Sequence, residues 1–178
     1  IVSSGFEASI PYASKEEFPP LPKHDKIKGA EILKKTFLRA LESVLFAAAT
    51  DEGRPILTGA KIQKVNKETL FVATDGYRLS LKRVDLETEE NLNITIPART
   101  LTEVVHIGLE DEENKNITLK IIDVSQLGFF FGETEIYTRI LDGEYPNFEK
   151  ILPKKHTTKI ILDKEKFFQA VKSTSIFA

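Results

Sequence analysis

The side chains that most often do chemistry in proteins are few in this chain and widely separated. Its three histidines, His24, His106 and His156, fit no His-Glu-x-x-His or similar metal-binding spacing. The chain has no cysteine, so thiolate metal sites, disulfides and cysteine nucleophiles are excluded. A Gly-x-Ser-x-Gly nucleophile elbow and the EF-hand calcium pattern are also missing from the sequence. We therefore expect no catalytic group, no metal site and no cofactor.

One carboxylate, Asp75, stands in a distinctive run, Ala-Thr-Asp-Gly-Tyr-Arg-Leu at residues 73–79. Asp-Gly between two apolar runs is a strong signal for a tight hairpin turn, which gives Asp75 and Gly76 a structural explanation. An enzyme, such as a hydrolase or nuclease that uses Asp75, remains an alternative. It is disfavoured because the carboxylates lie in turns without basic or metal-ligating companions. Loss of a metal-dependent nuclease activity in Asp75→Ala would establish it.

The composition restricts the class of protein. The chain has 178 residues, of which 41% are hydrophobic and 29% charged, as in a globular protein with a core. No stretch approaches the roughly 18–20 uncharged apolar residues of a membrane span. The net charge of −2 does not indicate a strongly basic nucleic-acid binder, although it allows a local basic face. The chain starts at Ile1 and contains no methionine, which predicts a fragment.

Two segments have the apolar spacing of helices. Ala30–Thr50 is the clearer one, because apolar residues recur there at intervals of three and four and so share one face. Ala98–Ile107 is a second, shorter helix. The predicted inward faces consist of Leu33, Phe37, Leu41, Val44 and Ala48 in the first helix, and of Leu101, Val104 and Val105 in the second.

Short apolar runs between turn signals predict seven strands. One of them, Tyr77–Val84, alternates apolar and polar residues, as a half-buried antiparallel strand does. Runs of strands interrupted by single helices favour an α+β fold with antiparallel sheets. The predicted order is helix, four strands, helix, three strands, so two halves repeat a common pattern. The other predicted strands are Ile56–Val65, Leu70–Thr74, Leu92–Pro97, Ile117–Ile122, Gly128–Phe131 and Glu135–Leu141.

A longer repeat indicates more than one copy of this domain. Residues 37–43 resemble residues 167–173, with phenylalanine, alanine and serine at matching places and an offset of 130 residues. Lys34 and Lys164 match at the same offset. We interpret Lys159–Ala178 as the first strand and helix of another, truncated copy.

Four motifs together resemble the bacterial DNA polymerase III β subunit family, the replicative sliding clamps. They are Thr-Asp-Gly-Tyr-Arg-Leu at 74–79, Gly-Arg-Pro-Ile-Leu-Thr-Gly at 53–59, Glu-Phe-Pro-Pro-Leu-Pro at 17–22, and Leu-Asp-Gly-Glu-Tyr-Pro-Asn-Phe at 141–148, followed by Ile-Leu-Pro at 151–153. The motifs stand in the family's order and span almost the whole chain. The resemblance implies the tail of a first clamp domain at residues 1–23, a complete middle domain at 24–153, and a linker with the truncated start of a third domain at 154–178.

Clamps of this family are non-catalytic ring-shaped homodimers, so the resemblance implies that the full-length protein encircles duplex DNA and confers processivity on a polymerase. The implied partners are duplex DNA, bound weakly and without sequence preference, and the DNA polymerase III α subunit, the clamp loader and repair polymerases. These proteins bind through short peptides with a glutamine and a terminal leucine and phenylalanine. The implied location is the bacterial cytoplasm, at the nucleoid and away from any membrane.

The resemblance also implies a groove for these peptides at the junction of the middle and third domains. Leucine, proline and isoleucine can wall an apolar pocket, glycine allows close backbone approach, and arginine can donate to peptide carbonyls or to an acidic side chain. Lys150 stands where some relatives carry arginine, which puts a bidentate contact in doubt. The matching positions are Leu57, Thr74, Gly76, Tyr77, Arg78, Leu79, Pro146 and Ile151, with Arg54 and Lys150 beside them.

A second implied surface is the helix face that looks toward DNA in such clamps. Cations near phosphates suffice for sequence-independent binding, and neighbouring glutamates dilute the basic character here. A generic α+β protein-interaction domain, which keeps the groove but does not encircle DNA, remains the alternative. The predicted DNA-facing residues are Lys34, Lys35 and Arg39 in the first helix and Arg99 and His106 in the second.

Overall fold

The computed structural model describes the chain except for residues 1, 19, 52, 87–91, 154 and 178. The chain divides into two units, Ile1–Tyr145 and Pro146–Ala178. This division falls eight residues before the end of the predicted middle domain at 153, and the predicted tail at 1–23 is grouped with the first unit.

Unit 1 consists of a small hairpin, a 3-10 turn and two halves that share one order of elements. The hairpin pairs β1 (Val2–Ser3) with β2 (Phe6–Glu7), and the turn η1 covers Lys15–Glu17. Each half is a strand, a helix and a three-strand meander. The first half is β3 (Ala30–Leu33), α1 (Lys34–Leu45), η2 (Pro55–Thr58), β4 (Gly59–Val65), β5 (Glu68–Thr74) and β6 (Leu79–Asp85). The second half is β7 (Asn93–Pro97), α2 (Ala98–Glu110), β8 (Asn116–Ile121), β9 (Gln126–Phe131) and β10 (Thr134–Arg139).

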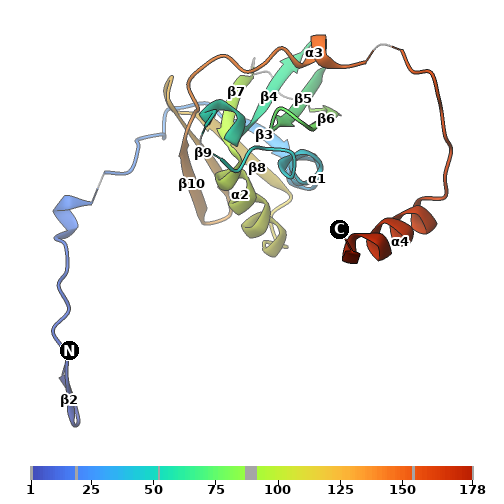
Figure 1. The fold of residues 1–178 in the computed structure, drawn as a ribbon. Coiled ribbons are helices and arrows are strands. Elements are labelled where there is room, and N and C mark those ends of the chain that lie inside the picture. The colour runs from blue at the N-terminus through green and yellow to red at the C-terminus, as the bar shows by residue number, and fades with distance from the viewer. Residues whose placement is uncertain (1, 19, 52, 87–91, 154, 178) are drawn as a thin grey trace. The chain divides into compact units, whose positions relative to one another are not determined.

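The two halves exchange their first strands. One antiparallel sheet has the order β6-β5-β4-β7, and the other has the order β10-β9-β8-β3. Ala30 of β3 therefore lies opposite Leu119 of the second half, and Gly59 of β4 lies opposite Pro97. Each sheet contains three strands of one half and the leading strand of the other (Figure 1).

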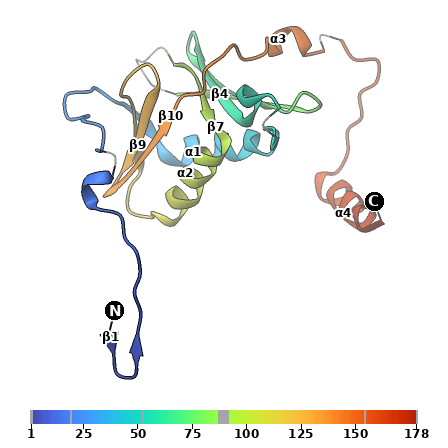
Figure 2. The ribbon, with the colours of Figure 1, turned by 60° about the vertical axis from the view of Figure 1, so that its left-hand side comes forward.

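One hydrophobic core joins both helices to both sheets. The helices α1 and α2 pack against each other and lie on one side of the sheets (Figures 1 and 2). Phe37 of α1 sits at the centre, with its ring 5.7 Å from Phe71 of one sheet and 6.0 Å from Phe129 of the other. The predicted inward residues of α2 are buried, as are the predicted residues of α1 from Phe37 onward. The predicted α+β fold with antiparallel sheets is confirmed.

The predicted start of the first helix is wrong. Ala30–Leu33 is a strand with alternating buried and exposed residues, and α1 begins only at Lys34 and ends at Leu45. Leu33, placed in the helix core by its spacing, points outward and is 55% exposed. The error arises because the strand alternation of Ala30 and Ile32 continues directly into the helical spacing. Leu33 fits both patterns, since it can lie on the outer face of a strand or on the apolar face of a helix.

The remaining predicted elements differ mainly at their ends. The predicted strand Ile56–Val65 begins at Gly59, because Pro55–Thr58 forms a 3-10 turn. The strand predicted from Tyr77 begins at Leu79, because the preceding residues belong to the turn. In the described part of the chain, no helix is long and apolar enough to cross a membrane.

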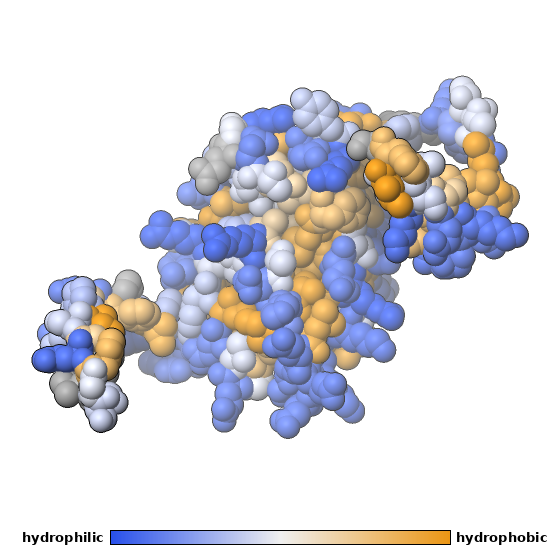
Figure 3. Space-filling view, turned by 60° about the horizontal axis from the view of Figure 1, so that its bottom comes forward, coloured by the Kyte–Doolittle hydropathy of each residue, from blue (hydrophilic) through white to orange (hydrophobic). Residues whose placement is uncertain are grey.

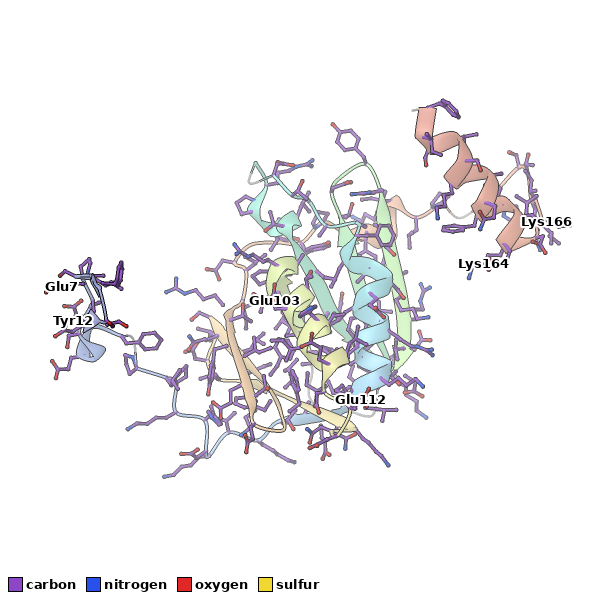
Figure 4. The ribbon with its side chains drawn as sticks, turned by 90° about the horizontal axis from the view of Figure 1, so that it is seen from below. Glu7, Tyr12, Glu103, Glu112, Lys164 and Lys166 are labelled. Carbon is purple, nitrogen blue, oxygen red and sulfur yellow. The ribbon has the colours of Figure 1, made fainter. Side chains whose placement is uncertain are left out.

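Unit 2 contains three short helical elements and no strand among its described residues. They are α3 (Phe148–Ile151), α4 (Lys164–Thr174) and η3 (Ser175–Phe177). The helix predicted in Lys159–Ala178 is present, and Lys164 and Lys166 mark its first turn in Figure 4. The strand predicted before it is not formed. A strand needs a neighbour for its backbone hydrogen bonds, and no described residue of unit 2 supplies one.

Candidate functional site

The turn between β5 and β6 is closed by its own side chains. The Asp75 carboxylate accepts from the backbone N–H groups of Tyr77 and Arg78, both at 2.9 Å, and from Nε of Arg78 at 2.9 Å. The Thr74 hydroxyl donates to the carbonyl of Arg78 at 2.7 Å and accepts from the N–H of Gly76 at 3.1 Å. These hydrogen bonds hold the backbone of the turn in one conformation, so a ligand would meet a preformed surface.

Asp75 is committed to this structure. The two backbone N–H donors, and secondarily the Arg78 side chain, hold the pKa of Asp75 below its ordinary value. A carboxylate that is stabilised in its ionised form is a weak proton acceptor, whereas a general base at neutral pH needs a raised pKa. The geometry of the turn therefore gives no support to the hydrolase or nuclease alternative.

Gly76 lies close to the side chain of Arg54 at the β5–β6 turn. Gly76 has φ +95°, in the left-handed region that favours glycine. A Cβ atom at this position would lie 2.7 Å from a guanidinium nitrogen of Arg54, which also donates to the carbonyl of Asp75 at 3.3 Å. Glycine here permits both the turn and the close approach of Arg54, so the structure brings these two predicted site residues together.

The predicted residues on the strands share the sheet face opposite the helices. Thr74 and Leu79 lie directly across from each other at the turn, and Val72 lies opposite Leu81 on the same face. Thr74 is buried, whereas Leu79 and Leu81 are half-buried and open to a ligand. Leu81 is missing from the predicted site, although its position two residues after Leu79 places it on that face.

Three other predicted residues differ in their access to solvent. Leu57 is only 2% exposed, so it can form the floor of a site but not a wall that a ligand reaches. Tyr77 at the tip of the turn is 98% exposed. The guanidinium carbon of Arg78 lies over the ring of Phe46, 6.0 Å from the ring centroid. Phe46 follows the last residue of α1, and no sequence pattern connects it with Arg78.

Three predicted groove residues belong to unit 2. Pro146 opens this unit, and Lys150 and Ile151 lie on the exposed side of the short helix α3. The Asn147 side chain caps α3 by accepting from the backbone N–H of Lys150 at 3.3 Å. The cap fixes the local direction in which Lys150 and Ile151 leave the backbone.

The helix face carries four of its five predicted cations. Lys35 and Arg39 on α1, and Arg99 and His106 on α2, are exposed. The prediction for Lys34 is wrong, because this residue is only 7% exposed. Its ammonium lies 3.1 Å from Oδ2 of Asp111 and donates to the Asp111 carbonyl, which ties the start of α1 to the end of α2.

Carboxylates balance these cations along the same face. Glu42 on α1 and Glu103 and Glu110 on α2 are exposed, and Glu110 lies 3.7 Å from Nε2 of His106. Figure 4 shows α1 and α2 side by side in front of the sheets, with Glu103 labelled on α2. The oblique view in Figure 3 shows polar side chains with apolar ones between them. The face is therefore of mixed charge, which favours weak contact with an anion over tight binding.

The residues that the structure describes hold no cluster of three or more His, Cys, Asp or Glu side chains placed to bind a metal ion. The site to be explained is therefore a turn with one sheet face and a separate helix face of mixed charge.

Residues 31–147 match the family model of the DNA polymerase III beta subunit, central domain. The chain belongs to this family. The match spans both β-α-β-β-β halves from β3 to β10, and it includes the turn between β5 and β6.

Curated DNA polymerase III beta subunits give the same assignment. The chain is 31% identical to the beta sliding clamp of Bacillus subtilis over 169 residues, which cover 92% of this chain and 43% of that protein. It is 28% identical to the beta sliding clamp of Staphylococcus aureus over 180 residues, covering 100% of this chain and 47% of that protein. The chain thus spans less than half the length of these relatives.

A solved sliding-clamp structure has a similar fold. The crystal structure of the DNA polymerase sliding clamp from Bacillus subtilis superimposes with a TM-score of 0.85 at 30% sequence identity. The superposition covers 93% of this chain and 43% of that one. The exchange of first strands between the halves is therefore a feature of a known fold.

Proposed function

We propose that this chain is the middle segment of a DNA sliding clamp. In its full-length form the protein would be a non-catalytic, ring-shaped homodimer that encircles duplex DNA and tethers the replicative polymerase. The observation that carries the proposal is the match of residues 31–147 to the central domain of the DNA polymerase III beta subunit. The proposed location is the bacterial cytoplasm, at the nucleoid.

The proposed contact with DNA uses the exposed basic side chains of the two helices, Lys35, Arg39, Arg99 and His106. Their number supports binding to the phosphate backbone without base readout. The carboxylates on the same face keep this contact weak, which suits a protein that must slide. Neutralisation of two or three phosphates would weaken binding on the order of tenfold between about 50 and about 200 mM salt.

The test of this surface is DNA binding at several salt concentrations, with duplexes of unrelated sequence. We expect Lys35→Ala, Arg39→Ala and Arg99→Ala, combined in one variant, to abolish the salt-dependent part. The control removes exposed cations outside the helices, Lys67→Ala and Arg83→Ala. Equal losses in both variants, or an affinity that ignores salt, would refute the helix face as the DNA contact.

The proposed partner site is a peptide groove on the β5–β6 turn. The half-buried Leu79, the buried floor residues Leu57 and Thr74, and the glycine-backed turn support an apolar pocket beside exposed donors. Pro146, Lys150 and Ile151, which belong to unit 2, are the remaining residues proposed to contact the peptide. The proposed ligands are short peptides of the polymerase III α subunit, the clamp loader and repair polymerases.

The first experiment for the groove is a titration of the chain with a peptide containing glutamine, leucine and phenylalanine, followed by backbone amide NMR. We expect shifts at Leu57, at residues 76–79 and at Ile151. Leu79→Ser should remove them with the fold intact, whereas Leu109→Ser, an exposed leucine on α2, should not. Silence at millimolar peptide, both here and in a chain extended through the third domain, would contradict the groove.

Encirclement needs a chain extended to the length of the relatives. A ring that surrounds DNA is retained on a closed circle and slides off a linear duplex, whereas a domain that only binds proteins or the DNA surface shows no such difference. We expect retention on circular DNA and rapid loss after a single cut. Equal retention on both forms would favour the generic protein-interaction domain.

A further inference from the structure

Arg78 is an exposed arginine that is nevertheless held on two sides. Its side chain is 59% exposed, yet Nε is bonded to Oδ2 of Asp75 at 2.9 Å. Its guanidinium carbon lies 6.0 Å from the centroid of the Phe46 ring, at the limit of a cation–π contact. The two contacts come from different elements, the turn itself and the end of α1.

Phe46 is a largely exposed aromatic residue beside Arg78. Its ring is 62% exposed, directly after the last residue of α1, while Ala47 and Ala48 beside it are buried. Among the described residues, the only ring or cation contact recorded for Phe46 is the one with Arg78. The Phe46 ring therefore lies at the surface, where both Arg78 and a ligand can reach it.

Fixing an arginine before binding affects affinity. A free arginine side chain has many rotamers, and much of this rotamer entropy is lost when a ligand immobilises it. With Nε bonded to Asp75, the edge formed by the two terminal nitrogens of Arg78 remains for a partner. That edge presents parallel N–H groups, which match an oxygen acceptor such as a peptide carbonyl.

We infer that Phe46 and Asp75 are positioning residues that hold the Arg78 guanidinium ready for an oxygen acceptor of the bound peptide. This inference rests on the proposed peptide groove and adds Phe46, at the end of α1, to the residues that determine its affinity. The rim of the groove would then include residues of both the β5–β6 turn and the end of α1.

Positioning can be measured in the free protein. We expect the Nε–H proton of Arg78 to exchange slowly with solvent, and its Cδ protons to be shifted upfield by the Phe46 ring. Phe46→Leu should abolish the ring shift, and Asp75→Asn, which keeps an oxygen acceptor for the two backbone N–H groups, should speed the exchange. Phe6→Leu, which alters an exposed phenylalanine in the N-terminal hairpin, should change neither signal.

A double-mutant cycle with the glutamine-, leucine- and phenylalanine-containing peptide tests the consequence for binding. We expect Phe46→Leu and Asp75→Asn each to weaken binding about three- to tenfold, and Phe46→Leu to have no further effect when Arg78 is already alanine. The same loss in both backgrounds, or no loss at all, would overturn the inference. If the wild-type chain and its extension bind no peptide, the groove itself is refuted, and the inference falls with it.

Discussion

The helices α1 and α4 have the same sequence pattern, 130 residues apart, but differ in the burial of their apolar residues. In α1 the residues Phe37 and Leu38 are buried at 1% and 2% exposure, while Phe167 and Phe168 at the matching places of α4 are each 56% exposed. The helix forms in both cases, but the strand before it forms only in unit 1, where β8 pairs with it. A helix is thus present with or without a packed apolar face, whereas the strand and the buried face are present only where partner elements lie beside them.

The largest test of this difference is a matched pair of truncations. Phe37→Ala removes the ring that joins both sheets, and we expect it to lower the free energy of unfolding by about 3–5 kcal/mol. Phe167→Ala at the matching place should change it by less than about 0.5 kcal/mol. Urea unfolding of both variants measures the difference. Comparable losses would show that α4 is buried in solution.

The two units differ in the effect that alkaline pH is expected to have on their stability. Burial raises the pKa of Tyr145 to about 12, and unit 2 contains no tyrosine. The stabilisation from keeping this phenol neutral is present below about pH 10 and is lost as the pH rises toward 12, amounting to about 2–3 kcal/mol. Urea unfolding at a series of pH values should show a smaller loss in Tyr145→Phe than in the wild type, because the pKa of Tyr137 is also raised to about 12 and its contribution stays. Identical pH profiles would contradict the assignment.

The matching lysines offer a third test. Lys34 is paired with Asp111 across the ends of α1 and α2, whereas Lys164 in α4 is exposed. We expect Lys34→Ala to cost about 1–3 kcal/mol, because it leaves Asp111 without its cation, and Lys164→Ala to cost almost nothing. Thermal unfolding of both variants gives the comparison. A stable Lys34→Ala would mean that Asn114, which also bonds Asp111, suffices.

The smallest expected effect concerns the helix starts. Asp163 caps α4 by accepting from the N–H of Lys166 at 2.9 Å, whereas Leu33 before α1 has no capping side chain. Asp163→Ala should reduce the helicity of α4 by an amount equivalent to about 0.5–2 kcal/mol, visible in its carbon chemical shifts. The fold of unit 1 should be unchanged. Unaltered shifts in α4 would show that tertiary contacts, and not its cap, maintain this helix.

Periodicity in the sequence was sufficient for the helices, most strands and the α+β class, because these depend on neighbours along the chain. It failed at Leu33, where a strand pattern and a helix pattern overlap. It also failed at Lys34, because the ammonium binds Asp111, 77 residues away. The contact of Phe46 with Arg78 was unpredictable for the same reason. The turn at Asp75 and Gly76 was predicted from the Asp-Gly pair itself. Its role in a peptide groove came only from the family resemblance and stays a prediction, like that of the groove residues in unit 2.

The exchange of first strands has a consequence for how the protein is made. On the ribosome, β3 emerges early, but its partner β8 follows only after both helices and four further strands have been synthesised. The meander β4-β5-β6 can form as soon as it emerges and can cover part of the apolar face of α1. The strand β3 and the part of α1 that packs against α2 and Phe129 wait for the second half. Pairings between distant segments slow folding and leave apolar surface exposed meanwhile. A nascent chain that stalls before Asn116 would therefore expose apolar surface and would bind chaperones or aggregate. Neither half would fold as an independent unit without the other.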